Sequence, residues 1–194
     1  MLLSIFLVLF ILITQFNSLS KPVIILSEIL FSIIGVLLGF SIFRMDFSII
    51  MTGMGLVALA GIVVRNGILL VEFTDKLKNE GMRTREAIIQ AGKIRITPIV
   101  LTATATILGL IPLAIGFNIN FGTLLTELNP QIHIGGDTKA FFGPLAWTII
   151  FGLSFATVLT LVFLPVMYNN LHTFKLRVSR GNHRRKLRRM EKRM

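Results

Sequence analysis

The sequence predicts an all-α membrane protein, a transmembrane bundle of about five helices over residues 1–168 that is followed by a basic tail at 169–194. Of the 194 residues, 54% are hydrophobic, and the mean hydropathy is +0.80. Long apolar runs alternate with short polar breaks, whereas a soluble domain of this size spreads its charges along amphipathic faces. The charge is concentrated, because ten of the twenty Lys and Arg residues follow Asn169.

The apolar runs have the length that a membrane requires. A hydrocarbon core of about 30 Å is crossed by a helix of about 20 apolar residues. Four segments meet this length, and a fifth, residues 1–16, is apolar but short. The fifth lacks the basic start and the small-residue cleavage site of a signal peptide. We therefore interpret it as a spanning helix cut at its N-terminus, and we expect the chain to begin inside a larger protein. The four full-length spans are 22–43, 47–73, 96–117 and 144–168.

Two connections between the spans carry structure of their own. Residues 84–93 place Ala87, Ile88 and Ala91 on one face, which predicts a short amphipathic helix on the cytoplasmic surface. Pro98 then falls in the first turn of the next span, where proline is tolerated. Residues 118–143 predict a polar periplasmic loop with turn signals, in which 131–134 can form a short strand.

The positive charges predict the orientation. If all five segments span, Lys21, the six Lys and Arg of residues 74–95 and the ten of the tail lie on one side, which makes seventeen. Only Arg44 and Lys139 lie on the other side. The positive-inside rule then predicts that the N-terminus lies outside and the tail in the cytoplasm. In a Gram-negative cell, this is an inner-membrane protein with a periplasmic N-terminus. The net charge of +11 thus indicates topology and contact with membrane lipids, and nucleic acid is not a predicted partner.

The sequence shows no arrangement typical of an enzyme. Cysteine is absent, and His133, His172 and His183 have neither a paired acid nor the spacing of metal ligands. The sequence contains no phosphate-binding glycine loop and no nucleophile elbow. We therefore expect no cofactor, no metal and no enzymatic activity.

Arg65 is the exceptional residue, because it lies inside a predicted span. A charge near the centre of a spanning helix costs about 2.5–3.5 kcal/mol on insertion scales, so it usually faces protein or water. Arg65 can instead extend to the cytoplasmic interface. We favour an inward position because Ala58 and Gly61 share its stripe with Ile68, and small residues allow close helix approach. The adjacent Asn66 adds donors and an acceptor.

Other polar residues within the spans are accessory candidates. Thr102 and Thr106 share one face and have two alternatives, a hydrogen bond across to Arg65 or Asn66, or one back to their own helix. Glu72 shares the stripe of Arg65, two turns away, and is expected at the cytoplasmic boundary as a solvated carboxylate.

Glu28, Gly35 and Gly39 complete the candidates. Glu28 can be a protonatable site or can reach the cytoplasmic interface, and we favour the interface. Gly35 and Gly39 form a GxxxG packing face.

Three stretches of the sequence resemble the C-terminal end of a resistance-nodulation-division (RND) efflux permease. They are GMGLVALAGIVVRNGILLVEFTDKL, TREAIIQAGKIRITPIVLTATATILGLIPLAIG and GPLAWTIIFGLSFATVLTLVFLPVMY. The resemblance covers residues 1 to about 168, with motifs in the same order and spacing. The segments QFNSLSKP and TELNP resemble those of members found in Bacteroidetes-type bacteria.

The resemblance implies a trimeric transporter with twelve helices per chain, of which these are the eighth to twelfth, that exports toxic compounds in exchange for protons. In the family a basic residue and the following Asn interact with an acidic pair of the fourth helix, and a Thr of the eleventh helix joins them. Arg65, Asn66 and Thr102 match these three positions. The family residue is typically Lys, and an Arg keeps the charge but cannot give up its proton.

The matching permeases contain parts that this sequence does not, namely the acidic pair, the first seven helices and both periplasmic porter regions. The resemblance thus implies three partners: the remaining N-terminal portion of the permease, a periplasmic adaptor and an outer-membrane channel. We expect a C-terminal membrane fragment of a proton-driven RND transporter that supplies the basic and polar side of its proton relay. The alternatives are a truncated or split-gene fragment without transport of its own, a nontransporting scaffold, and a component of lipid or protein export.

Overall fold

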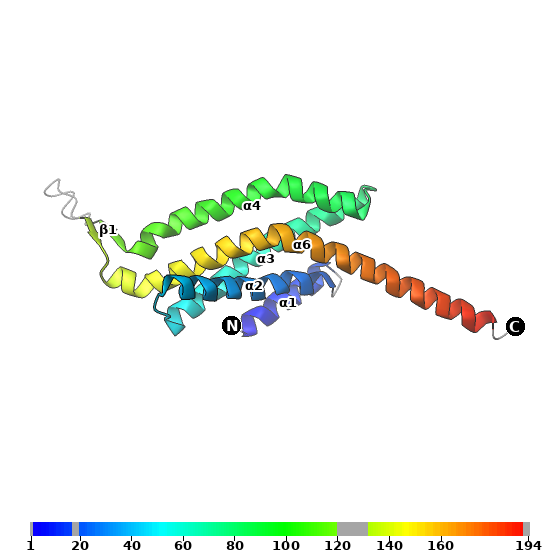
Figure 1. The fold of residues 1–194 in the computed structure, drawn as a ribbon, viewed down its shortest axis with the longest axis horizontal. Helices are drawn as coiled ribbons and strands as arrows, with labels where there is room; N and C mark the ends of the chain where they lie inside the picture. The colour runs from blue at the N-terminus through cyan, green and yellow to red at the C-terminus, as the bar shows by residue number, and fades with distance from the viewer. Residues whose placement is uncertain (1, 17–19, 120–131, 192–194) are drawn as a thin grey trace.

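The computed structural model describes residues 2–16, 20–119 and 132–191, and this part of the chain is almost entirely helical (Figure 1). The helices form one elongated bundle, and a two-stranded hairpin lies at its end opposite the C-terminus. The prediction of an all-α bundle is confirmed. The elements are α1 (Leu2–Phe16), α2 (Ser20–Phe43), α3 (Ile49–Asn79), α4 (Thr84–Ile115), β1 (Phe117–Ile119), β2 (Ile132–Ile134) and α6 (Asp137–Glu191).

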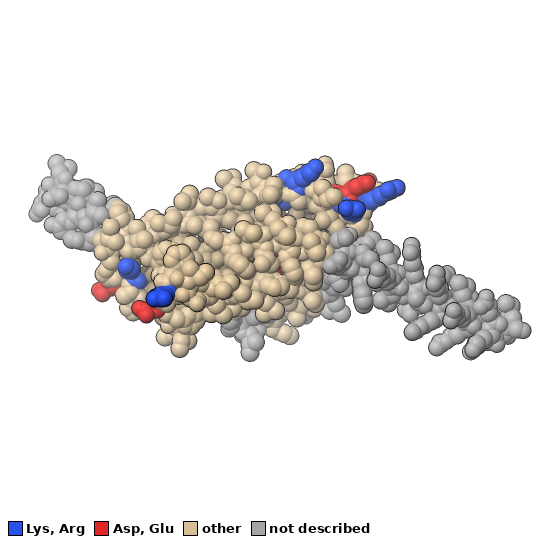
Figure 2. All heavy atoms as spheres, in the orientation of Figure 1, with Lys and Arg blue, Asp and Glu red and all other residues tan. Residues whose placement is uncertain are grey.

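Four of the helices are long and apolar enough to cross a membrane: Lys21–Phe43 of α2, α3, α4, and Asp137–Tyr168 of α6. In α1 the apolar helix is shorter, at Phe6–Phe16, in keeping with the short first segment that the sequence predicts. Figure 2 shows coloured charged side chains at the two ends of the bundle and a broad band of other residues between them. This band carries large exposed apolar side chains such as Leu101 and Val162, as expected of a lipid-facing surface.

Helix α6 holds the bundle together, because its N-terminal part contacts α2, α3 and α4, whereas its C-terminal part extends beyond the other helices (Figure 1). The predicted GxxxG face forms one of these contacts and is thereby confirmed. A Cβ atom added at Gly35 would lie 2.4 Å from Cβ of Phe155, and one added at Gly39 would lie 2.3 Å from Cγ of Phe151. Only residues without a side chain allow α2 to approach α6 this closely.

The prediction of a separate amphipathic helix at 84–93 is wrong. Helix α4 runs without a break from Thr84 to Ile115, with Pro98 and Pro112 inside it. Ala87, Ile88 and Ala91 do share one face, but that face is buried in the core of the bundle and does not lie on lipid. A proline removes one backbone hydrogen bond, and packing of the flanking turns outweighs this loss.

Helix α6 is also longer than predicted at both ends. It begins at Asp137, so the C-terminal part of the predicted loop 118–143 is helical, and residues 120–131 of that loop lie outside the described residues. The helix passes Pro165 and continues to Glu191, through most of the predicted tail. The structure does not describe the side chains of residues 169–194.

A short hairpin joins α4 to α6. Gly116 ends α4 in the left-handed conformation at φ 71°, and its carbonyl accepts a hydrogen bond of 2.9 Å from the backbone N–H of Gly135. Strands β1 and β2 pair antiparallel, with Phe117 opposite Ile134. The strand predicted at 131–134 is thus confirmed over Ile132–Ile134, and it brings the start of α6 beside the end of α4.

Candidate functional site

A partly open cavity with several polar residues in its lining lies between helices α3 and α4, within the apolar band of the bundle. Its volume is about 310 Å³, and Leu153 of α6 closes one side. Three of its polar residues, Arg65, Asn66 and Thr102, are those the sequence assigns to a proton relay, and Thr106 is one of the predicted accessory residues. The full lining is Ile62, Arg65, Asn66, Leu69, Arg95, Pro98, Ile99, Thr102, Ala103, Thr106 and Leu153.

Arg65 and Asn66 occupy different environments although they are neighbours. Asn66 is buried at 8% exposure, whereas Arg65 lies on the exposed side of α3. Among the described residues no carboxylate lies within ion-pair distance of Arg65. The small-residue stripe beside it is likewise open, because a Cβ added at Gly61 would meet no atom within 4 Å. The helix expected to pack on this stripe is therefore not supplied by the described part of the chain.

The two threonines of the cavity adopt the second of the two predicted alternatives. The hydroxyl of Thr102 donates to the carbonyl of Ile99 at 3.1 Å, and that of Thr106 donates to the carbonyl of Thr102 at 2.8 Å. Both hydroxyls bond back to their own helix and not to Arg65 or Asn66. Each oxygen keeps acceptor capacity beside the cavity.

Arg95, which the sequence predicts in a cytoplasmic connection, adds a second cation to the cavity. Because α4 is continuous, Arg95 lies on the same helix as Thr102, seven residues earlier and about 10 Å along the axis. Seven residues are close to two helical turns, so this spacing already indicated a shared face. The guanidinium lies 4.7 Å from the centre of the Phe73 ring. Its Nε is buried, with no hydrogen-bond partner among the described residues.

Glu72 lies outside the Arg65 cavity. It is exposed and lines a neighbouring cavity of about 620 Å³, together with Asp75 and Arg95. A solvated position at the boundary was expected for it. Arg95 borders both cavities and therefore separates the Arg65 site from the acidic end of α3.

Glu28 also lies away from the cavity, in the interior of the bundle. Its exposure is 2%, and its carboxylate contacts the position of Gly67 on α3. The favoured interpretation, that Glu28 reaches the cytoplasmic interface, is wrong. Lys21, which begins the span, is seven residues away, so Glu28 lies about 10 Å deeper along α2.

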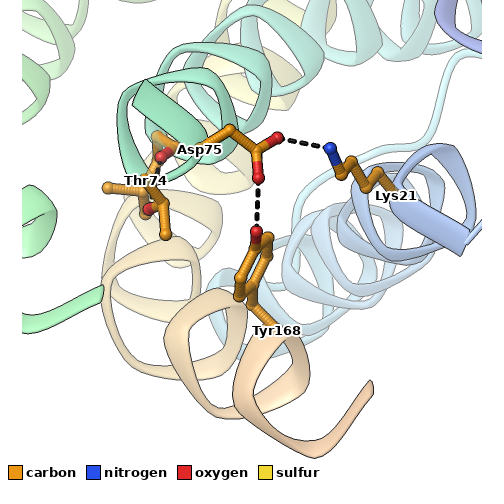
Figure 3. A network of polar contacts seen from close by, with 5 residues as sticks. Lys21, Thr74, Asp75 and Tyr168 are labelled. Carbon is orange, nitrogen blue, oxygen red and sulfur yellow. Dashed lines mark hydrogen bonds and ion pairs between the residues drawn. The ribbon is translucent and has the colours of Figure 1, made fainter. Parts of the chain in front are cut away.

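A second polar cluster, which no pattern in the sequence indicates, fixes the end of the bundle at which α2 begins. Lys21 pairs with Oδ2 of Asp75, and the hydroxyl of Tyr168 donates to Oδ1 at 2.5 Å (Figure 3). The cluster joins α2, α3 and α6 and so fixes α3, which forms one wall of the cavity. Asp75 and Tyr168 are 93 residues apart, and no local pattern pairs them.

The long apolar helices, the charged ends and the polar intramembrane cavity define a multi-pass α-helical membrane protein. Within this class, residues 1–172 match the family described as the AcrB/AcrD/AcrF family. The chain belongs to this family of RND permeases, and the resemblance seen in the sequence is confirmed.

Named relatives support the assignment. The chain is 35% identical over 175 residues to the swarming motility protein SwrC of Bacillus subtilis, covering 90% of this chain and 15% of that protein. It is 36% identical over 163 residues to the multidrug resistance protein MdtC of Erwinia tasmaniensis, covering 84% and 14%. A crystal structure of a heavy metal efflux pump matches with a TM-score of 0.69 at 27% identity, covering 87% of this chain and 15% of that one. The chain thus spans a small part of its relatives' length.

Proposed function

We propose that this chain is the C-terminal membrane portion of a proton-driven RND efflux transporter and supplies the basic and polar side of its proton relay. One observation carries the proposal. Arg65, Asn66 and Thr102, from two different helices, line one cavity in the apolar band of a member of an efflux family.

The chemistry of these groups suits a responding role. An arginine stays protonated, so Arg65 provides a fixed positive charge and does not carry the proton. Such a charge stabilises a facing carboxylate, and protonation of that carboxylate removes the attraction. Two states of the bundle then differ in whether Arg65 is paired, which allows proton binding to shift their populations.

The proposal places the carboxylates on a segment other than the described helices. The open stripe of Ala58 and Gly61 beside Arg65 offers a surface on which a further helix can pack closely. An exposed arginine in an apolar band is costly next to lipid, which favours cover by protein. This partner segment is the remaining N-terminal portion of the permease.

The family supports the wider setting of the proposal. We infer an inner-membrane location with a periplasmic N-terminus and a cytoplasmic tail, surrounded by membrane lipids. The intact permease would work as a homotrimer with a periplasmic adaptor and an outer-membrane channel. Its activity is transport of a xenobiotic against protons and not catalysis.

The test is Arg65→Ala in the complete permease, with Lys93→Ala as the matched control. Lys93 is an exposed cation on α4 and lies outside the cavity lining. We expect Arg65→Ala to abolish drug efflux at an unchanged membrane level of protein, because the carboxylates lose their counter-charge. Arg65→Lys should retain activity, as should Lys93→Ala. Unchanged efflux by Arg65→Ala would refute the relay assignment.

A second candidate is a membrane fragment without transport of its own. The absence of an ion-pair partner for Arg65 among the described residues favours it. Reconstitution of the purified chain in proteoliposomes, with and without the N-terminal portion of the permease, distinguishes the two candidates. Proton-coupled efflux should appear only when the N-terminal portion is reconstituted with it, and the fragment candidate predicts no efflux in either case.

A further inference from the structure

Glu28 is a buried acid that the Arg65 site does not use. It lies on α2, its exposure is 2%, and neither carboxylate oxygen has a hydrogen-bond partner among the described residues. A buried polar group without a partner loses its hydration and gains nothing in return. Such a group in a membrane helix therefore indicates a role other than stability.

The surroundings of Glu28 form a close-fitting pocket between three helices. On α3 a Cβ added at Gly67 would lie 2.7 Å from Oε2 of Glu28, so the carboxyl group fills the notch that this glycine leaves. On α6 the buried hydroxyl of Thr160 lies beside the carboxyl group without completing a hydrogen bond. Ile25, one turn away on α2, also packs against Gly67.

Among the side chains that the structure describes, no cation forms an ion pair with Glu28. The residues of α1 that the structure describes, 2–16, include no ionisable side chain. On α2, α3 and α6 the ionisable groups on this side are Lys21, Asp75 and Tyr168, which bind one another about 10 Å away along the helices. Arg65 lines the cavity toward α4 instead.

We propose that Glu28 is a proton-binding site, separate from the Arg65 cavity, whose occupancy sets the contact between α2 and α3 at Gly67. With a proton bound, the neutral acid fits the apolar notch. On release, the O–H bond breaks and the proton passes to a water molecule that enters between the helices. The carboxylate that is left requires hydration, which the closed notch does not allow, so α2 and α3 separate there.

The notch is placed to affect the Arg65 site. Gly67 directly follows Asn66, which lines the cavity on another side of α3. A shift of α3 at Gly67 therefore moves Asn66 and Arg65 relative to α4. The link to transport rests on the proposed function, whereas proton binding at Glu28 does not.

The first test is infrared difference spectroscopy of the purified chain in lipid nanodiscs between acidic and alkaline pH. We expect a carbonyl stretch of a protonated, weakly hydrogen-bonded carboxylic acid that disappears at alkaline pH. Glu28→Gln preserves the volume and cannot titrate, so the band should be absent from it. The control Glu72→Gln removes an exposed boundary acid and should leave the band in place. A band that persists in Glu28→Gln, or no such band in the wild type, overturns the proposal.

The second test measures the movement of α3. Because the sequence contains no cysteine, Leu69→Cys provides a unique site for a spin label on the cavity wall. The label's mobility should change with pH at the same midpoint as the infrared band. Adding Glu28→Gln should hold the label in its acidic-pH state throughout. A pH response that survives Glu28→Gln refutes the coupling.

Failure of this inference is distinguishable from failure of the proposed function. Arg65→Ala should leave the infrared band of Glu28 intact in the chain. In the complete permease, Glu28→Gln should alter the pH dependence of efflux, whereas Arg65→Ala abolishes efflux. If Arg65→Ala leaves efflux unchanged and the infrared band of Glu28 is present, only the relay role of Arg65 is contradicted. A relay confirmed by Arg65→Ala with no band from Glu28 contradicts only the present inference.

Discussion

Gly39→Ala tests whether the contact between α2 and α6 determines the stability of the bundle. The added Cβ would lie 2.3 Å from Cγ and 2.7 Å from Cβ of Phe151, whereas carbon atoms pack best at about 3.5–4.0 Å. The ring of Phe151 stacks on Phe43 at 5.1 Å and on Trp147 at 5.2 Å, so turning it away would break both contacts. Its Cβ is fixed to the backbone, so the helices themselves must separate. Overpacking of this kind costs about 1–3 kcal/mol.

Tryptophan fluorescence can measure the effect of this change. Trp147 is the only tryptophan and stacks on Phe151, so its fluorescence reports on the contact. We expect the midpoint of unfolding by SDS in mixed micelles to fall for Gly39→Ala. Gly53→Ala is the matched control, because a Cβ added at Gly53 meets no atom within 4 Å. Equal midpoints for the two variants would refute the reasoning from close approach.

Two further predictions concern α3, the helix that forms one wall of the Arg65 cavity. In the isolated chain, Gly61→Ala should leave the free energy of unfolding unchanged or raise it by up to about 1 kcal/mol, since the added Cβ meets no atom within 4 Å. In the complete permease the same change should impair efflux, because the proposal places another helix on this stripe; full efflux would argue against that helix. Asp75→Asn should destabilise the bundle by about 1–3 kcal/mol in the same SDS titration, because it weakens the bonds to both Lys21 and Tyr168. Tyr168→Phe removes one hydrogen bond and should cost about 0.5–1.5 kcal/mol; an Asp75→Asn effect no larger than this would show that the ion pair contributes nothing.

Local sequence patterns predicted a large part of the architecture. The length of the apolar runs was enough to locate the four long helices, because a helix that crosses a membrane must be apolar over about 20 residues. The spacing of Gly35 and Gly39 identified a packing face, since residues four apart lie on one side of a helix. Arg65 was detectable because a charge in an apolar run is costly wherever its partner lies.

Helix ends were less predictable. Prolines and turn residues predicted a helix break before Pro98 and a loop that ends just before Pro144. Helix α4 runs through Pro98 and helix α6 runs through Pro144. A single proline removes one hydrogen bond, and the contacts of the adjacent turns decide whether the helix continues. Those contacts involve other helices, which a local pattern does not contain.

The amino-acid sequence is enough to predict a membrane-spanning helical protein with a charge at Arg65 and a close-packing glycine face. The folded bundle was needed to see that Arg95 shares the cavity of Arg65, that Asp75 binds Tyr168, and that Glu28 lies in the notch of Gly67. The difference comes from the range of the interactions. Helix formation and membrane partition depend on neighbouring residues, whereas a buried carboxyl group depends on three helices whose faces meet only in the folded bundle.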